Sequence, residues 1–90
     1  MLRKLPMKCN ISDKLQGYYT KVGGLVKEAR KKANMSVGML AILAGVTPKH
    51  IEFLESGRPG YQNGYFMERV ARVLEVDVES IYPTVKDGVL

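Results

Sequence analysis

Apolar residues recur at helical spacing along most of the chain, and no segment gives a convincing strand pattern. A first helix is expected from about Thr20 to Ala33, with a stretch of positive charge near its C-terminal end, where it offsets the helix dipole. Asn34 follows and tolerates the left-handed backbone that ends a helix. The apolar face of this helix is formed by Val22, Val26, Ala29 and Ala33.

Two short helices are predicted next, separated by a tight corner. Ser36 is a good N-cap for a helix that ends at Ala44, and Gly45 supplies the positive φ for the corner. Thr47 caps the following helix, which Pro48 opens at a position where the missing N–H costs nothing. That helix is expected to reach Ser56 and to end at Gly57. The inward positions of the two helices are Leu40, Ala41, Ala44, Ile51 and Leu54.

The last third of the chain predicts a loop and two more helices. Arg58–Gly64 has the composition of a loop, and Asn63 can cap a helix from Gly64 to Leu74. Asp77 can cap a short helix that Pro83 ends. The apolar positions of this part are Phe66, Met67, Val70, Ala71, Leu74, Ile81 and Tyr82. The pattern as a whole predicts an all-α fold, a compact bundle of five helices.

Charge divides the chain more clearly than hydrophobicity does. The formal net charge is +5, and most of the excess lies in the first 21 residues, where Asp13 is the sole acid. We therefore divide the chain into a basic N-terminal arm (1–19) with a short helical turn starting near Asn10, a helical domain (20–83) and a C-terminal tail (84–90). The arm is either a source of phosphate contacts or a solubilising leader. Met7 is an alternative start.

The inventory of reactive side chains argues against catalysis. Cys9 and His50 are the only cysteine and the only histidine, too few for an internal disulfide or a structural zinc site. Gly23-Gly24 lacks the Lys-Ser/Thr completion of a phosphate loop. We expect no enzyme, no metal and no cofactor. Neither a signal peptide nor a membrane span is evident, so we expect a cytoplasmic, nucleoid-associated protein.

Residues 22–83 resemble the Xre family of lambda-repressor-like helix-turn-helix regulators. The resemblance covers about two-thirds of the chain, and its strength lies in the order and spacing of many individually weak markers. These are Gly23, Val26 and Arg30, then Met35-Ser36, Leu40-Ala41 and Gly45-Val46-Thr47, then Ile51, Leu54-Glu55 and Gly57, and finally Val70-Ala71, Leu74 and Val76-Asp77.

The resemblance implies specific roles for side chains on and around the second short helix. Candidates for reading base edges are Pro48, Lys49, His50, Glu52 and Phe53. Candidates for phosphate contacts are Ser36, Val37, Thr47, Arg58, Tyr61 and Asn63. The family also pairs an arginine of the first helix with a glutamate at the end of the third, which here are Arg30 and Glu55. The alternative is that both are solvated surface charges.

Some of these positions have an equally good structural interpretation. His50 is either a phosphate contact or a surface imidazole without a role, and Phe53 either meets a thymine methyl, is half-buried, or contacts a protein. Val37 stands where many family members carry a glutamine that bonds phosphate. Glu52 and Glu55 leave the helix without a net basic character, and Glu75 replaces the glycine that usually ends helix four.

Two functions follow from this pattern. The first is a sequence-specific regulator of transcription, a homodimeric repressor whose partners are double-stranded DNA and a second copy of itself, with no membrane and no small-molecule substrate. Two-fold symmetry would place its recognition helices about 34 Å apart, in successive major grooves. The alternative is a protein-interaction module of the same fold, an antitoxin or a bridging cofactor, with weak or no DNA binding.

Overall fold

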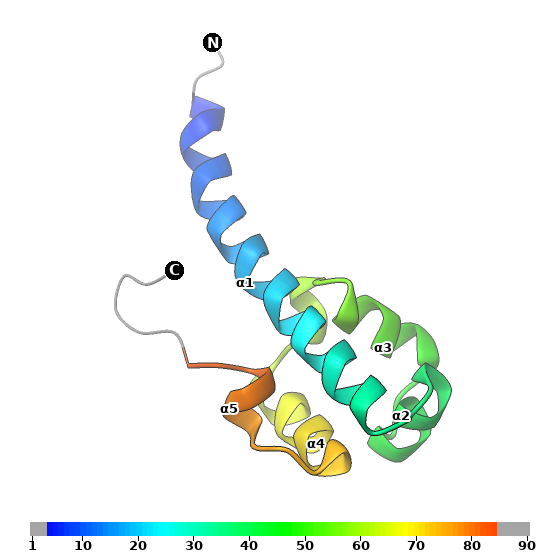
Figure 1. The fold of residues 1–90 in the computed structure, drawn as a ribbon. Coiled ribbons are helices and arrows are strands. Elements are labelled where there is room, and N and C mark those ends of the chain that lie inside the picture. The colour runs from blue at the N-terminus through cyan, green and yellow to red at the C-terminus, as the bar shows by residue number, and fades with distance from the viewer. Residues whose placement is uncertain (1–3, 85–90) are drawn as a thin grey trace.

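The protein is a bundle of five helices (Figure 1). The structure, a computed structural model, describes the backbone of residues 4–84 and the side chains of residues 15–84. The helices are α1 (Lys4–Lys32), α2 (Val37–Ala44), α3 (Pro48–Glu55), α4 (Gly64–Leu74) and α5 (Val78–Ile81), with a 3-10 turn η1 (Pro59–Tyr61) between α3 and α4. The described residues contain no strand. The predicted all-α, five-helix fold is confirmed.

The first helix is longer than the sequence pattern predicts. α1 begins at Lys4 and runs without interruption past Thr20, so the expected helix start there is wrong. Its N-terminal half extends away from the other four helices (Figure 1), and the described chain measures 48 × 27 × 20 Å. Pro6 lies in the first turn, where its missing N–H breaks no helical bond, and nothing after it forces the helix to end.

The corner between α2 and α3 is built by the predicted residues. The Ser36 hydroxyl accepts a hydrogen bond of 3.0 Å from the Met39 N–H, and the Thr47 hydroxyl accepts one of 3.2 Å from the His50 N–H. Gly45 has a φ of 77°, in the region that favours glycine. The two helices meet at 110°. This angle holds α3 across the end of α2.

α4 and α5 also begin where the sequence predicts. The Asn63 side chain accepts a hydrogen bond of 2.9 Å from the Phe66 N–H, which caps α4. Glu75 ends that helix in the left-handed region, with a φ of 58°. Asp77 occupies the N-cap position of α5, but its side chain makes no capping hydrogen bond.

All of α1 to α5 contribute to a single aliphatic core. Its buried members are Val22, Val26, Leu40, Ala41, Ala44, Ile51, Leu54, Phe66, Met67, Val70, Ala71, Leu74 and Ile81. Every predicted inward position of α2, α3 and α4 is in this core. Ala29 and Tyr82 are half-buried, whereas Ala33, the residue after the end of α1, is exposed.

No single helix among the described residues has the length and apolar composition to cross a bilayer. Only α2 and α3 taken together, across their bend, reach that length and apolar composition. Buried helices of soluble proteins reach them as well.

Candidate functional site

Arg30 and Glu55 hold the C-terminal end of α3 against α1. Arg30 Nε donates to Glu55 Oε2 at 2.6 Å and Nη2 donates to Oε1 at 3.1 Å, while Nη1 donates to the Met35 carbonyl at 2.9 Å. The two side chains are 10% and 8% exposed, so the solvated alternative does not apply. The hydrogen bond to Glu55 raises the pKa of Arg30 above its ordinary value, although burial opposes this rise. The guanidinium therefore stays charged, and it ties the corner before α2 to both helices.

Four of the predicted DNA-contacting side chains pack against one another or against the body. The ring of half-buried His50 lies 4.9 Å from Tyr61 and 4.6 Å from Phe66, centroid to centroid. Its Nε2 is buried, and no hydrogen-bond partner for it occurs in residues 15–84. Phe53 packs 5.0 Å from Tyr61, and the Arg58 guanidinium lies 4.2 Å above its ring. These residues form a structural aromatic cluster beside α3.

Three of the predicted phosphate contacts are helix caps, namely Ser36, Thr47 and Asn63. The side-chain oxygen of each accepts a hydrogen bond from a backbone N–H of the helix that it caps. Val37 is half-buried.

The outward surface of α3 carries little net charge. Pro48, Lys49 and Glu52 are exposed there, and the two charges have opposite signs. Lys49 Nζ lies 6.0 Å from the centre of the Phe53 ring, at the edge of the range for a cation–π contact. Such a surface gives weak electrostatic attraction for a polyanion.

An exposed apolar surface lies on α2. Met39, Ile42 and Leu43 point outward with 49%, 75% and 53% of their surface exposed. Next to them, Arg69 Nη1 donates to the Ala44 carbonyl at the end of α2 at 3.0 Å, and its guanidinium lies 5.5 Å above the ring of Tyr65, which is 76% exposed.

We call these five residues (Met39, Ile42, Leu43, Tyr65 and Arg69) the α2 face. α2 itself lies at the end of the molecule away from the N-terminus of α1 (Figure 1). The sequence interpretation missed this surface, although a signal for it was present. The segment 37–44, VGMLAILA, has no polar side chain, and a helix that is apolar on all sides needs neighbours on all sides. The other four helices of this small bundle cannot cover every side of α2.

The described residues contain no group of three or more His, Cys, Asp or Glu side chains that could hold a metal ion.

No protein-family profile and no curated protein matches the chain. Solved structures do match it. One is an Fe(II)-bound HppE in complex with its substrate, which shares 29% sequence identity and a TM-score of 0.67 over 80% of this chain and 43% of that one. Hydroxypropylphosphonic acid epoxidase from S. wedmorenis matches with the same identity and TM-score and 40% of its length. A Co(II)-bound HppE with substrate matches over 42% of its length. The chain thus spans about two-fifths of the solved chains that it matches.

These matches correct several predictions. The interpretation as a DNA-binding transcriptional regulator that acts as a repressor is contradicted because the structures that share the fold are those of an epoxidase. The expectation that the chain is not an enzyme is contradicted by the same structures. The expectation of double-stranded DNA as partner, with no small-molecule substrate, conflicts with metal-bound neighbours that hold substrates. These predictions failed because the helix caps and the tight turn specify the helical fold, and proteins with one fold can carry different surfaces and functions.

Proposed function

We propose that this chain forms the helical part of a metal-dependent enzyme similar to HppE, whose substrate is a small phosphonic acid. The observation that carries the proposal is the match to the Fe(II)-bound structure, at 29% identity over 80% of this chain. An identity of this size over four-fifths of the chain supports a relationship closer than a shared architecture.

The described residues do not fit an iron site. A non-haem iron site uses a cluster of histidines and carboxylates, and the described residues offer none. His50, the single histidine, lies between the rings of Tyr61 and Phe66. No catalytic step is therefore assigned to these side chains. In the proposed enzyme the iron ligands belong to the part of the protein that this chain does not match.

The contribution of the helical part is to dock on that catalytic part through the α2 face. Methionine, aromatic residues and arginine are the types enriched in protein interfaces. Ile42 and Tyr65 are the most exposed of the large apolar residues on the described surface. Burial of one such side chain stabilises a complex by about 1.5–3 kcal/mol. The hydrogen bond to the Ala44 carbonyl fixes the Arg69 side chain, so this side chain loses little conformational freedom when the two parts bind.

A chimaera tests both the proposed function and the proposed docking through the α2 face. The part of HppE that this chain matches is replaced by this chain, and Fe(II)-dependent epoxidation of hydroxypropylphosphonic acid is measured together with iron content. We expect activity well above that of HppE lacking the matched part. Ile42→Glu in the chimaera is expected to abolish this gain, because it places a charge in the docked interface.

Lys27→Glu is the matched control, since Lys27 is exposed on α1 and lies outside the α2 face. It should leave the chimaera active. A chimaera that folds and holds iron but gains no activity contradicts the proposed function. Equal activities for the Ile42 and Lys27 variants contradict the proposed docking surface.

A further inference from the structure

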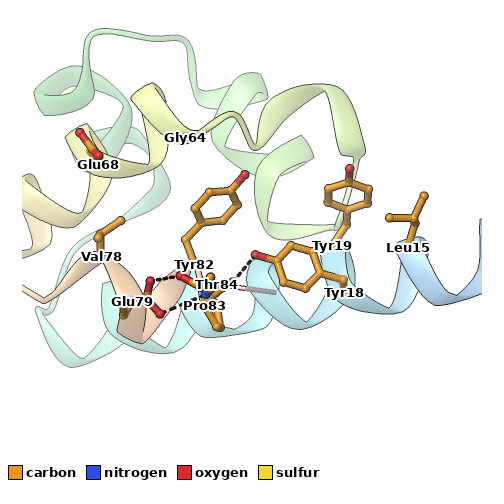
Figure 2. Close-up of a pocket in the computed structure, with 10 residues that line it drawn as sticks. All are labelled: Leu15, Tyr18, Tyr19, Gly64, Glu68, Val78, Glu79, Tyr82, Pro83 and Thr84. Atoms are coloured by element: carbon orange, nitrogen blue, oxygen red, sulfur yellow. Dashed lines mark hydrogen bonds between the residues drawn. The ribbon is translucent and has the colours of Figure 1, made fainter. Parts of the chain in front are cut away.

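A second surface feature is a pocket of about 410 Å³ between α1, the start of α4 and α5 (Figure 2). It shares no residue with the α2 face. Three tyrosines line it, Tyr18 and Tyr19 from α1 and Tyr82 from the end of α5. Two carboxylates also line it, Glu68 from α4 and Glu79 from α5.

The tyrosine rings meet at steep angles. The Tyr18 and Tyr82 rings are 6.2 Å apart and inclined by 57°, and the Tyr18 and Tyr19 rings are 5.8 Å apart and inclined by 71°. Tyr18 is fixed in place, because its hydroxyl donates a hydrogen bond of 2.6 Å to the Pro83 carbonyl. In Figure 2 the rings of Tyr19 and Tyr82 stand on either side of Tyr18. The pocket therefore has aromatic walls on more than one side.

The charges of the pocket all have one sign. Glu68 and Glu79 are the charged residues among those of 15–84 that line it. Glu79 is held at the rim because its Oε1 accepts a hydrogen bond of 3.0 Å from the Thr84 N–H and its Oε2 accepts one from the Thr84 hydroxyl. Burial raises the pKa of Tyr18, and Tyr82, Glu79 and Tyr19 raise it further.

We propose that this pocket binds an organic ammonium cation, such as a quaternary or methylated amine. Aromatic faces attract cations of this kind through the ring quadrupole, and nearby carboxylates strengthen the attraction. The same two carboxylates repel a phosphonate. The pocket is thus a binding site distinct from any phosphonate site of the proposed enzyme.

The test compares choline with 3,3-dimethyl-1-butanol, its uncharged counterpart of the same shape, by NMR titration of the intact chain. Choline should shift the amide signals of Tyr18, Gly64 and Tyr82, and it should bind about tenfold more tightly than the alcohol, as expected for a partly desolvated cation–π contact. Equal binding of the two compounds overturns the proposal. So does the absence of binding, or a shift pattern that lies outside the pocket.

Two pairs of variants make the test specific. Tyr82→Leu removes the ring and should weaken choline binding severalfold, whereas Tyr82→Phe keeps the ring and should retain it. Glu68→Gln should also weaken binding, whereas Glu52→Gln neutralises an exposed carboxylate of α3 outside the pocket and should not. Choline binding that is the same in Glu68→Gln and in Glu52→Gln overturns the proposal even if Tyr82→Leu does not fold. These measurements use this chain alone, so their result is independent of the chimaera.

Discussion

Arg30 and Glu55 are joined by two parallel hydrogen bonds, 2.6 and 3.1 Å long, that connect the last turn of α1 to the last residue of α3. A fork of this geometry fixes both the distance and the rotation of the two helices. The position of α3 therefore depends on a charged contact as well as on core packing.

Removal of one partner of this pair should be costly. Glu55→Ala leaves the Arg30 guanidinium buried without a counter-charge, and we expect a loss of about 3 kcal/mol in the free energy of unfolding. The double variant Arg30→Met/Glu55→Leu should be more stable than Glu55→Ala, because it leaves no unpaired charge. Urea denaturation of the three proteins measures the difference. A double variant no more stable than Glu55→Ala would contradict this account.

Adjacent glycines in α1 should respond in opposite directions. A Cβ at Gly23 would lie 2.4 Å from the Glu55 carbonyl oxygen, while one at Gly24 would meet nothing within 4 Å. Gly23→Ala must push α1 away from the end of α3, which costs about 2 kcal/mol or more. Gly24→Ala relieves the entropy cost of glycine in a helix and should stabilise the fold by about 0.5–1 kcal/mol. Thermal denaturation of both variants is the measurement, and similar shifts in Tm would contradict the close approach.

Glu75 occupies a backbone conformation that favours glycine. Its φ of 58° ends α4, and its N–H donates to the Ala71 and Arg72 carbonyls. Glu75→Gly should raise the free energy of unfolding by about 0.5–1 kcal/mol, because the strain of a side chain in the left-handed region disappears. Glu75→Ala removes the same charge and keeps the strain, so it serves as the control. If the alanine variant gained as much stability in urea as the glycine variant, the gain would come from charge.

The Tyr18 hydroxyl should make stability depend on alkaline pH. Burial raises its pKa in the folded protein above the ordinary 10.0, with smaller contributions from Tyr82, Glu79 and Tyr19. The unfolded chain then loses this proton at lower pH than the folded chain does. The contribution of Tyr18 is therefore complete below pH 10 and is lost as the pH rises through the higher folded-state pKa.

Urea denaturation at several pH values should show this as a difference in slope. The free energy of unfolding of the wild type should fall more steeply above pH 10 than that of Tyr18→Phe. Below that pH the two curves should run parallel, offset by the lost hydrogen bond to Pro83. Curves that stay parallel throughout would show that the hydroxyl has the same pKa in both states.

The helix termini were predictable because local chemistry decides them. Ser36, Thr47 and Asn63 each form the cap that the sequence indicates, and Gly45 takes the expected left-handed conformation. These signals need only neighbouring residues, so one sequence is sufficient to find them.

The start of α1 was not predictable in the same way. The expected helix started at Thr20, although Gly23 and Gly24 weaken its first turns. In the structure Gly23 is required by the contact with Glu55, and a Cβ at Gly17 or Gly24 would meet only open space. A glycine that weakens a helix locally can thus be needed by a residue far along the chain.

The function could not be read from the corner that builds the fold. Ser36 and Thr47 were assigned both a capping and a phosphate-binding role, but the sequence could not decide between them. Ile42 and Leu43 carried the more useful information, because exposed apolar residues indicate a partner surface. That exposure is known only once the positions of the other helices are known.

The unbroken course of α1 makes it a lever. At a rise of about 1.5 Å per residue, Lys4 lies about 18 Å along the axis from Gln16, whose side chain donates a hydrogen bond to the Gly57 carbonyl. A rotation of about 10° at that contact would move the first turn by about 3 Å, because the displacement grows with distance along a rigid rod. Small changes in packing around Gln16 would therefore be amplified at the far end of the helix.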